Sequence, residues 1–358
     1  MQKNSSFLLP NGLNDLLFPA AENEAAIIQN CMNVFSSFSY NRVKPPLIEF
    51  EESLLAPGPG KTLAEKTFRM MDPVSGKMLG VRADTTAQIA RIAKSRFEDS
   101  AKPLRLSYAA DILRVKASQL RPDRQFCQVG CELIGARDAK DDVEVMLIAL
   151  KSLRACNLKN LSVDLTVPNL VDALFDSEKM SVEEREKANQ ILLKRDRDGL
   201  NTLSNKKIIS YLSALLDASG LAEQAVAALK KIKTPRASKE SIQNILSVYE
   251  ELKKALEAFD LQDVKVTIDL VERRGLEYKT GVGFTLFSKD IRGELGRGGR
   301  YYLDNTQDHV ATGFTLYMDS MIQSFKSNAS EEIQIVSQNT DWEKIKDYQK
   351  QGLTVLRE

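Results

Sequence analysis

The 358-residue sequence predicts an α+β fold in which a helical insert splits a mixed sheet. Two observations support this prediction. Short apolar or alternating runs typical of strands occur in residues 1–167 and again in residues 261–322. Between them, residues 168–260 carry almost only helical periodicity, for example in ESIQNILSVYEELKKALEAF.

The first core segment, residues 1–167, alternates between helices and strands. Apolar spacing predicts helices over 20–40, 85–98 and 139–156. Strands are predicted for PPLIEFEESLL, 104–116, 124–135 and LSVDLTV, together with a hairpin that turns at 72–76. The second core segment, 261–322, contributes the strands VKVTIDLV, VGFTLF and HVATGFTLYM. Residues 323–358 have the pattern of a short strand–helix–strand remnant.

Composition excludes several classes of site. Lysine plus arginine total 50 and aspartate plus glutamate total 49, so the net charge gives no argument for a nucleic-acid or membrane partner, although a local basic patch is compatible with it. One histidine and four scattered cysteines predict no metal site, and the cysteines are expected to be buried. No secretory segment and no apolar run of about 18 residues is visible, so the cytoplasm is the expected location.

The strand RQFCQVGCELIG, residues 124–135, places Gln128, Gly130 and Glu132 on one face because side chains alternate along a strand. Gln128 and Glu132 are then roughly 13 Å apart. Gly130 leaves the backbone bare between them, as happens where a ligand approaches closely. This face is either a ligand floor for amino or imidazole N–H groups, or an ordinary polar face in water.

Three other stretches carry polar groups that suit a charged ligand. VRADTTAQIAR offers Asp84 and Thr86, where Asp84 either accepts from an ammonium group or caps the following helix. RRGLEYKTG offers Arg274 and Tyr278, and the arginine either holds a carboxylate or phosphate or forms a surface ion pair. GRGGRYY either cradles an anion or forms a simple turn.

Taken together, these stretches resemble the histidyl-tRNA synthetase family over residues 10–322. The resemblance lies in RADTT at 82–86, YAADILRV at 108–115 followed by RQFCQVGCELIG, RGLEYK at 274–279, GGRY at 298–301 and GFTLYMDS at 313–320. It implies a class II aminoacyl-tRNA synthetase-like core, with a mainly antiparallel sheet flanked by helices.

The sequence departs from that family where the family binds ATP. Ser320 stands where the synthetases carry the arginine that clamps the ATP phosphates, and Lys116 replaces the glutamate that reads adenine. Lys279 and Tyr302 replace a tyrosine and an aspartate of two further motifs. Losing one such clamp costs about 3–4 kcal/mol of transition-state stabilisation, so amino-acid activation is not expected. The residues after Ser320 are fewer than the about 50 that a domain needs, so no full anticodon-binding domain is expected.

The phrases RADTTAQIARI, LRPDRQFCQVGCELIG and ATGFTLYMD resemble the ATP phosphoribosyltransferase regulatory subunit family more closely. This resemblance implies a non-catalytic chain of histidine biosynthesis with no cofactor and no tRNA. Its implied partner is the short-form catalytic subunit, in a hetero-octamer with four copies of each chain. It further implies a self-dimer through the synthetase-like core, and histidine as the feedback effector. The alternatives are a minimal histidyl-tRNA synthetase lacking its anticodon-binding domain, and a stand-alone synthetase-like amino-acid-binding module.

The same resemblance assigns roles to individual residues. Asp84, Thr86 and Gln128 are expected to hold the amino group of histidine, and Glu132 is expected to accept the imidazole N–H.

Three further residues complete the expected pocket. Arg114 and Arg274 are expected to face a carboxylate or phosphate, with Tyr278 close to the pocket. Lys279 weakens the imidazole contact, because a cation beside the pocket disfavours a protonated ring.

Overall fold

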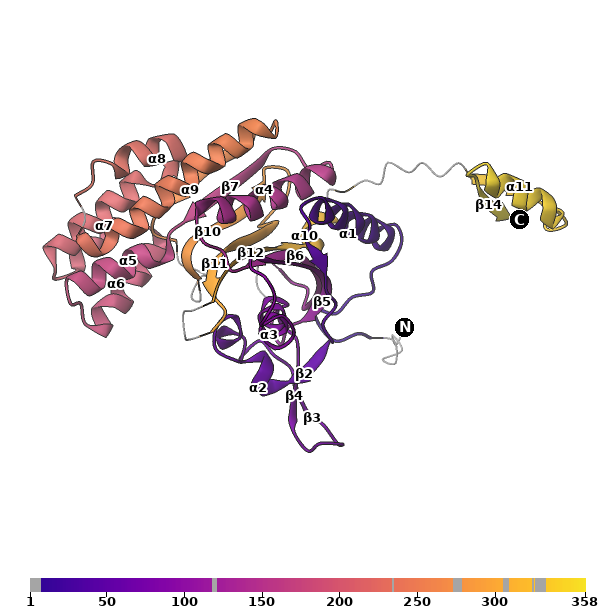
Figure 1. Ribbon diagram of the computed structural model, residues 1–358, viewed down its shortest axis with the longest axis horizontal. Helices are drawn as coiled ribbons and strands as arrows, with labels where there is room; N and C mark the ends of the chain where they lie inside the picture. The colour runs from indigo at the N-terminus through magenta and orange to yellow at the C-terminus, as the bar shows by residue number, and fades with distance from the viewer. Residues whose placement is uncertain are drawn as a thin grey trace, which may run out of the picture. The chain divides into compact units, whose positions relative to one another are not determined.

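The computed structural model describes residues 8–117, 121–233, 235–272, 279–304, 309–323, 325 and 333–358. It divides the chain into two compact units, Met1–Ser324 and Phe325–Glu358. In the described part of the first unit, a nine-stranded sheet has the order β1-β5-β6-β12-β11-β10-β7-β9-β8 (Figure 1). Its strands are, in that order, Asn41–Arg42, Leu104–Leu113, Gln125–Ile134, Val310–Tyr317, Gly296–Tyr302, Lys279–Ser288, Leu161–Thr166, Lys265–Asp269 and Gly220–Leu221.

The pairing of these strands is mainly antiparallel. Among the described strands of this sheet, β1 pairs with β5 and β7 pairs with β9 in parallel, whereas the other neighbours are antiparallel. The prediction of an α+β fold with a mixed, mainly antiparallel sheet is therefore confirmed.

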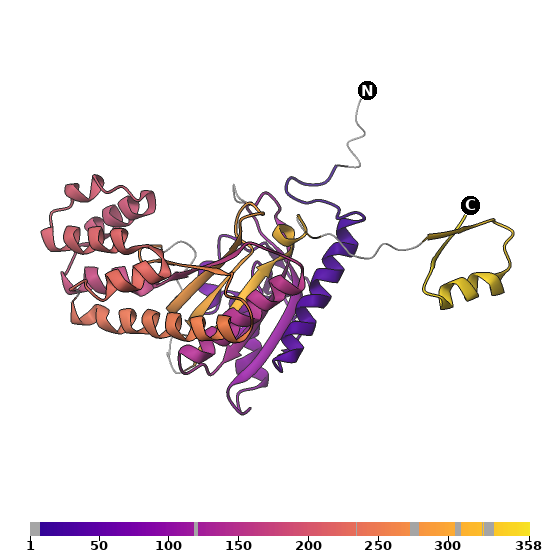
Figure 2. The ribbon, with the colours of Figure 1, turned by 90° about the horizontal axis from the view of Figure 1, so that it is seen from above.

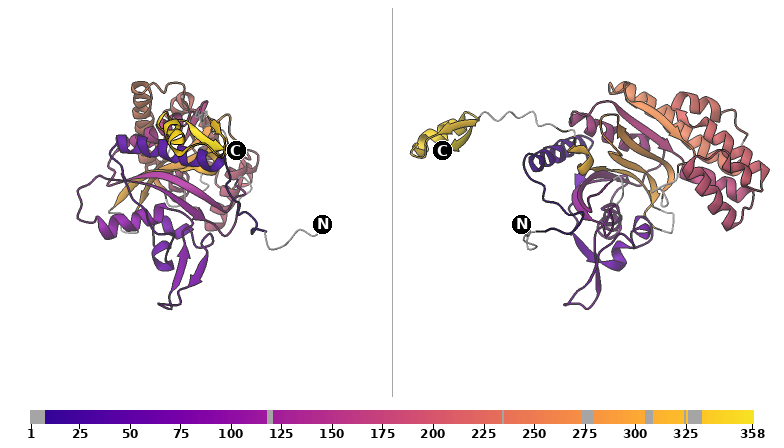
Figure 3. Two further views of the ribbon diagram at one scale, coloured as in Figure 1. Left: turned by 90° about the vertical axis from the view of Figure 1, so that its right-hand side faces the viewer. Right: turned by 180° about the vertical axis from the view of Figure 1, so that it is seen from behind.

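Helices cover both faces of the sheet around β6. On one face, α1 (Ala20–Ser37) and α4 (Ala139–Ala155) contact β6, and on the other face α3 (Thr86–Arg96) contacts the same strand (Figures 1 and 3). As a result, β6 is buried continuously from Phe126 to Ile134. The polar register of this strand is therefore not a face in water.

A three-stranded sheet of order β2-β4-β3 lies below α3 in Figure 1. It consists of β2 (Ile48–Phe50), β4 (Met78–Val81) and β3 (Arg69–Met71). The prediction of one strand over PPLIEFEESLL is wrong beyond Phe50, because the chain turns there into the short helix α2 (Glu51–Leu54). Glu51 and Glu52 occupy its first turn, where the helix dipole favours negative charge, and Glu51 also pairs with Arg69 at 2.5 Å.

The helical insert connects β7 to β9. Because these neighbouring strands are parallel, the chain must cross over between them, and the insert forms that crossover. Its helices are α5 (Pro168–Ser177), α6 (Val182–Lys194), α7 (Lys206–Ala218), α8 (Ala222–Leu229) and α9 (Lys239–Ala258). The insert also contains two short 3-10 turns and the two-residue strand β8, which the helical periodicity did not predict. Helix α9 runs beside α4 (Figure 2).

The second unit contains β13 (Ile333–Val336), α11 (Trp342–Lys350) and β14 (Thr354–Arg357), which is the strand–helix–strand order that the sequence predicts. The two strands pair in parallel, and α11 lies on one side of them (Figure 2). Ile345 of this helix is buried, whereas Ile333, Ile335 and Leu356 are exposed.

All four cysteines are buried and unpaired, as predicted. Within the described residues, no cluster of histidine, cysteine and carboxylate side chains could bind a metal ion. None of the helices described above combines the length and apolarity needed to cross a bilayer.

Candidate functional site

A cavity of about 150 Å³ opens in the first unit above the middle of the sheet. Its walls come from β6, β11 and β12, from the turn before α3, from the end of β5 and from the segment around η2 (Pro59–Thr62). Asp84, Thr86, Arg114 and Glu132 all line it, so four of the seven predicted site residues meet at one place. A cavity of this size accepts a single small ring.

Glu132 forms the floor of this cavity. Its side chain is 1% exposed, and Oε2 accepts a hydrogen bond of 2.7 Å from the Tyr301 hydroxyl. Gly313 lies opposite Glu132 in the β6–β12 register. A Cβ at position 313 would lie 1.9 Å from Glu132 Oε2, so a glycine is required there for the carboxylate to occupy its place.

Gln128 is fully buried and lies behind the cavity rather than in its lining. Its Nε2 donates to Asp84 Oδ2 at 3.0 Å, and its Oε1 accepts from the Thr85 N–H at 3.0 Å. Asp84 Oδ1 also accepts from the Thr86 N–H at 3.0 Å, at the start of α3. Asp84 therefore accepts a hydrogen bond from a helix N–H and also lines the cavity. Gln128 orients the Asp84 carboxylate through its hydrogen bond.

The space over Gly130 is filled by a side chain of this protein. Tyr108 lies opposite Gly130 in the β5–β6 register, and a Cβ at position 130 would lie 2.6 Å from the Tyr108 hydroxyl oxygen. The expectation that a ligand approaches the Gly130 backbone is therefore wrong. The fully buried Tyr108 ring needs that room, and its hydroxyl lies 2.7 Å from Thr315 Oγ1.

Tyr108 is a neutral phenol. Burial raises its pKa well above the ordinary value, and the nearby carboxylates of Glu132 and Asp84 raise it further. Tyr108 was not among the predicted site residues, although it stands in the strand YAADILRV that carried the resemblance. The available signal was the position of Tyr108 in the side-chain alternation of its strand. This position identifies Tyr108 as the neighbour of Gly130 only when the pairing of β5 with β6 is known.

Arg114 closes one side of the cavity. Its Nη2 lies 3.8 Å from Asp84 Oδ2, and its Nε donates to the Ala83 carbonyl at 3.2 Å. Arg274 and Tyr278, the two other predicted residues of the pocket, lie outside the described residues. The side chain of Lys279 lies outside them as well.

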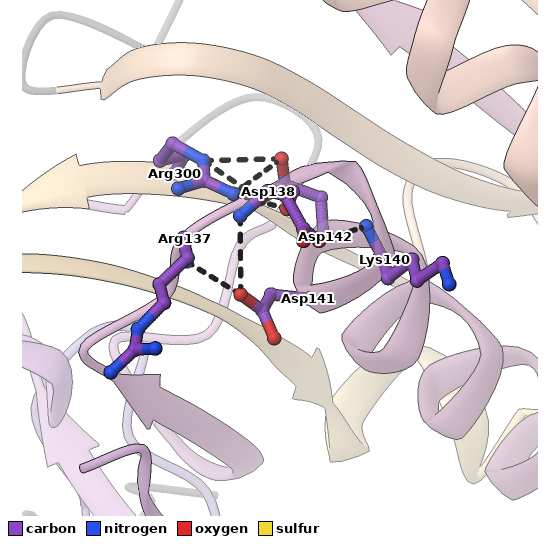
Figure 4. Close-up of polar contacts among 6 residues, drawn as sticks. All are labelled: Arg137, Asp138, Lys140, Asp141, Asp142 and Arg300. Atoms are coloured by element: carbon purple, nitrogen blue, oxygen red, sulfur yellow. Dashed lines mark hydrogen bonds and ion pairs between the residues drawn. The ribbon is translucent and has the colours of Figure 1, made fainter.

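The glycine-rich segment GRGGRYY is strand β11, and the expectation of a turn is wrong. A Cβ at Gly298 would lie 2.2 Å from the Phe284 ring, so the glycine permits close packing of two strands. Arg297 lines the cavity and pairs with Glu294. Arg300 does not line the cavity. It binds Asp142 at 2.9 Å, at the start of α4 (Figure 4).

Ser320, where the resemblance to the synthetases leads us to expect a phosphate-binding arginine, lies beside another arginine, Arg121. Ser320 is buried, and its hydroxyl accepts from Arg121 Nη2 at 3.3 Å. Arg121 also pairs with Asp319 at 2.7 Å, and its guanidinium carbon lies 3.8 Å from the centroid of the Tyr317 ring and 4.7 Å from that of Phe126. The Arg121 guanidinium therefore contacts two polar side chains, Ser320 and Asp319, and two aromatic rings beside the cavity.

Comparisons with known proteins agree with these features. The family model described as Histidyl-tRNA synthetase matches residues 12–321. The ATP phosphoribosyltransferase regulatory subunit of Rhodospirillum centenum is 45% identical over 320 residues, which cover 89% of this chain and 81% of that protein. The protein of the same description from Paramagnetospirillum magneticum is 44% identical over 315 residues, with 88% and 81% covered.

Solved structures give the same fold. A structure described as an ATP phosphoribosyltransferase regulatory subunit/histidyl-tRNA synthetase from Bacillus halodurans C has a TM-score of 0.83 at 26% identity, covering 100% of this chain and 94% of that one. Histidyl-tRNA synthetase from Nostoc sp. PCC 7120 has a TM-score of 0.78 at 16% identity, covering 98% and 86%. The predicted class II synthetase-like fold is thus confirmed. The chain belongs to the histidyl-tRNA synthetase-like family of ATP phosphoribosyltransferase regulatory subunits, which serve histidine biosynthesis without catalysing its first reaction themselves.

Proposed function

We propose that this chain binds the short-form catalytic subunit of ATP phosphoribosyltransferase, raises its activity and makes it sensitive to histidine. The observation that carries this proposal is a cavity with the chemistry of an amino-acid site inside a chain of the regulatory family. Histidine must bind the active and inactive arrangements of the assembly with different affinities, because equal binding shifts no equilibrium.

Histidine would enter the cavity with its ring toward Glu132. The buried carboxylate accepts the imidazole N–H, while Asp84 and Thr86 hold the amino group. Arg114 faces the ligand carboxylate, and Gln128 keeps Asp84 in place through its hydrogen bond.

Arg274 and Tyr278 would complete the site around the same ligand. Their place in the motif RGLEYK is the basis of this assignment.

Calorimetric titration of histidine into the complex of both chains tests the site. The variant Glu132→Gln keeps the volume and removes the charge, so the affinity is expected to fall about tenfold to hundredfold, as for loss of a charge-assisted hydrogen bond. The matched control is Glu98→Gln, which makes the same change on an exposed residue in the turn after α3. An unchanged affinity in Glu132→Gln would remove this cavity from the mechanism.

Formation of phosphoribosyl-ATP tests the regulatory role. The catalytic subunit is assayed alone, with this chain, and with this chain plus histidine. Activity is expected to rise on mixing and to fall with histidine, and the fall should be absent with Glu132→Gln. Equal rates with and without this chain would contradict the proposal.

The assembly that we propose is a hetero-octamer in the cytoplasm, with four copies of each chain, built on a self-dimer of this one. A surface suited to self-association lies on the β2-β4-β3 sheet. By register, Phe50, Leu79 and Met70 share one face with Ile48, and all but Leu79 are more than a third exposed. Mass measurement of the complex tests the stoichiometry.

A second candidate is a minimal histidyl-tRNA synthetase, because the Bacillus halodurans structure carries both descriptions. Arg121 and Tyr317 argue against it, since they occupy the region next to Ser320. The discriminating measurement is histidine-dependent exchange between ATP and pyrophosphate, and robust exchange would favour the synthetase. A stand-alone amino-acid-binding module would instead fail to co-purify with the catalytic subunit.

A further inference from the structure

A cavity of about 460 Å³ lies where the helical insert meets the edge of the nine-stranded sheet. Its walls come from the start of α8, the second half of α9 and the start of β9. Helix α8 contacts both of the other elements, and α8 and α9 lie side by side in Figure 1. This insert cavity shares no lining residue with the cavity over Glu132, and its volume is in the range of small-molecule sites.

The interior of the insert cavity is apolar. Six of its twelve lining residues are aliphatic or aromatic, namely Leu221, Ala222, Tyr249, Leu256, Val264 and Val266. Leu256 and Val264 are buried, whereas Leu221 is 43% exposed at the mouth. An apolar group that enters the cavity would cover this exposed surface and leave water itself, and both changes favour binding.

The charged side chains of the lining are balanced and lie at the mouth. Glu223 of α8 pairs with Lys253 of α9 at 3.8 Å, and the two side chains are 78% and 62% exposed. The other two charged residues of the lining, Glu257 and Lys265, are also exposed and of opposite sign. A ligand with a net charge therefore gains no net attraction from this lining.

The start of α8 supplies hydrogen-bond donors to the insert cavity. The first N–H groups of a helix have no acceptor within the helix. The N-cap residue of α8 is Leu221, and no side chain caps this end. Residues 221–224 all line the cavity, so an acceptor atom bound there can reach these N–H groups.

Tyr249 supplies a hydroxyl group inside the same cavity. The residue is 7% exposed, and among the described residues its hydroxyl makes no hydrogen bond. Burial raises the pKa of Tyr249, and the carboxylates of Glu223 and Glu250 raise it further. The hydroxyl is therefore a neutral group near the start of α8, and it can both donate and accept a hydrogen bond.

We propose that the insert cavity binds a small uncharged molecule that has an apolar body and an amide head group. The amide carbonyl accepts from the N–H groups at the start of α8, and the amide N–H donates to the Tyr249 hydroxyl. The apolar body lies against Leu256, Val264 and Val266. Because α8, α9 and β9 all contribute, a bound molecule joins the insert to the sheet. The proposal does not depend on the function proposed above.

Titration of hexanamide into the full chain, followed by NMR, tests the site. The amide signals of residues 222–224 are expected to shift, because the head group binds at the start of α8. Acetamide has the same head group without the apolar body, and it is expected to bind at least about tenfold more weakly. Hexanoate and hexylammonium keep the body but carry a charge, and both are expected to bind more weakly than hexanamide because the charge loses its hydration.

Two variants identify the groups that bind. Tyr249→Phe removes only the hydroxyl, and the affinity for hexanamide is expected to fall about fivefold, as for loss of a neutral hydrogen bond. Leu221→Gln replaces apolar surface at the mouth, and a fall of about fivefold is expected as well. The matched controls Tyr211→Phe in α7 and Leu193→Gln in α6 change residues outside the lining and should bind as the unmodified chain does. Thermal unfolding of each variant verifies that the fold is retained.

Three outcomes overturn the proposal. The first is that millimolar hexanamide shifts none of the signals of residues 222–224. The second is that either Tyr249→Phe or Leu221→Gln binds hexanamide as tightly as the unmodified chain. The third is that hexanoate or hexylammonium binds more tightly than hexanamide, which would mean that the site takes a charged ligand.

Discussion

At the scale of single residues, the cavity over Glu132 depends on which positions lack a side chain. Gly313 leaves the room in which the Glu132 carboxylate lies, and Gly130 leaves the room for the Tyr108 ring. The carboxylate is then held by the Tyr301 hydroxyl. The polar groups of the cavity are thus placed by close packing of neighbouring strands, in which even one added carbon must displace an atom.

Gly313→Ala is expected to lower the free energy of unfolding by about 1–3 kcal/mol, as overpacking does in a dense core. The added Cβ would lie 1.9 Å from Glu132 Oε2 and 2.5 Å from the Cys131 carbonyl oxygen. Urea unfolding measures the loss. Because Glu132 is one of the two obstacles, the penalty should be smaller in a Glu132→Ala background, and an equal penalty would contradict this account.

Gln128→Met is expected to destabilise the fold by about 1–3 kcal/mol, because the buried Thr85 N–H loses its acceptor and Asp84 loses a donor. Gln125→Met, on the exposed first residue of β6, makes the same chemical change and is the control. Urea unfolding of both variants gives the comparison. Equal stabilities of the two variants would show that the Gln128 hydrogen bonds contribute nothing.

At the scale of elements, one ion pair joins the middle of the sheet to a helix. Arg300 of β11 donates through Nε and Nη2 to Asp142 of α4, and through Nη2 to the Asp138 carbonyl at 2.6 Å (Figure 4). Asp138 and Asp141 form a capping box at the start of the same helix. Burial raises the pKa of Asp142, and Arg300 opposes this rise by stabilising the charged form. The arginine of GGRY is thus a link between elements.

Arg300→Gln is expected to cost about 3 kcal/mol of stability, because it leaves the Asp142 carboxylate buried without its partner. Adding Asp142→Asn should restore part of the loss. The control is Arg197→Gln, which breaks an ion pair with Asp217 whose side chains are 58% and 57% exposed, and should cost less than about 1 kcal/mol. Chemical denaturation of the four proteins measures the difference, and equal losses for Arg300→Gln and Arg197→Gln would contradict the role assigned here.

Asp164 joins the two parallel strands that flank the insert, and it makes their stability depend on pH. Burial raises its pKa to about 6, while a hydrogen bond from Thr267 opposes the rise and Asp269 adds to it. A carboxyl whose pKa is higher in the folded state stabilises the fold fully below its unfolded pKa of about 3.9. That contribution is lost as the pH rises through about 6.

Asp164→Asn removes this titration but keeps an acceptor for Thr267. Relative to the unmodified chain, the variant is expected to gain stability as the pH rises from about 4 to above 6, by up to about 3 kcal/mol. Urea unfolding across this range measures the gain, with the exposed Asp198→Asn as a control that should show no trend. A difference independent of pH would rule out titration of Asp164 as the cause.

At the scale of the whole molecule, one face of the β2-β4-β3 sheet presents apolar side chains that the described residues cover only in part. Its other face packs against Leu54 of α2 and against Thr67, both of which would lie 2.9 Å from a Cβ at Gly80. Ile48, Phe50 and Met70 are 37%, 39% and 42% exposed on the open face. Contiguous apolar surface of this kind is typical of a contact between chains.

Met70→Glu is expected to weaken self-association about tenfold or more, because a carboxylate buried in an apolar contact costs several kcal/mol. Sedimentation velocity of the purified chain over a range of concentrations measures the change. Val74→Glu is the control, because Val74 lies at the 92% exposed tip of the same hairpin. Unaltered sedimentation of Met70→Glu would contradict the proposed self-association through this face.

Much of the fold follows from local patterns in the chain. The strand RQFCQVGCELIG, the helical insert and the terminal strand–helix–strand unit could be predicted because each has a periodicity that its own residues carry. GRGGRYY could not be predicted as a strand, because glycines disfavour strands locally and only the close approach of β10 and β12 requires them. The end of β2 at Phe50 was missed because the acidic turn that follows begins a helix of only four residues.

The amino-acid sequence alone was enough to predict the family, the type of core and four residues that meet in the cavity, which are Asp84, Thr86, Arg114 and Glu132. Tertiary structure decided how the remaining groups are used. It placed Gln128 behind Asp84, filled the space over Gly130 with Tyr108, and turned Arg300 toward a helix. The reason is physical: side-chain alternation is encoded in one strand, but what occupies the space in front of it depends on the register of strands distant in the chain.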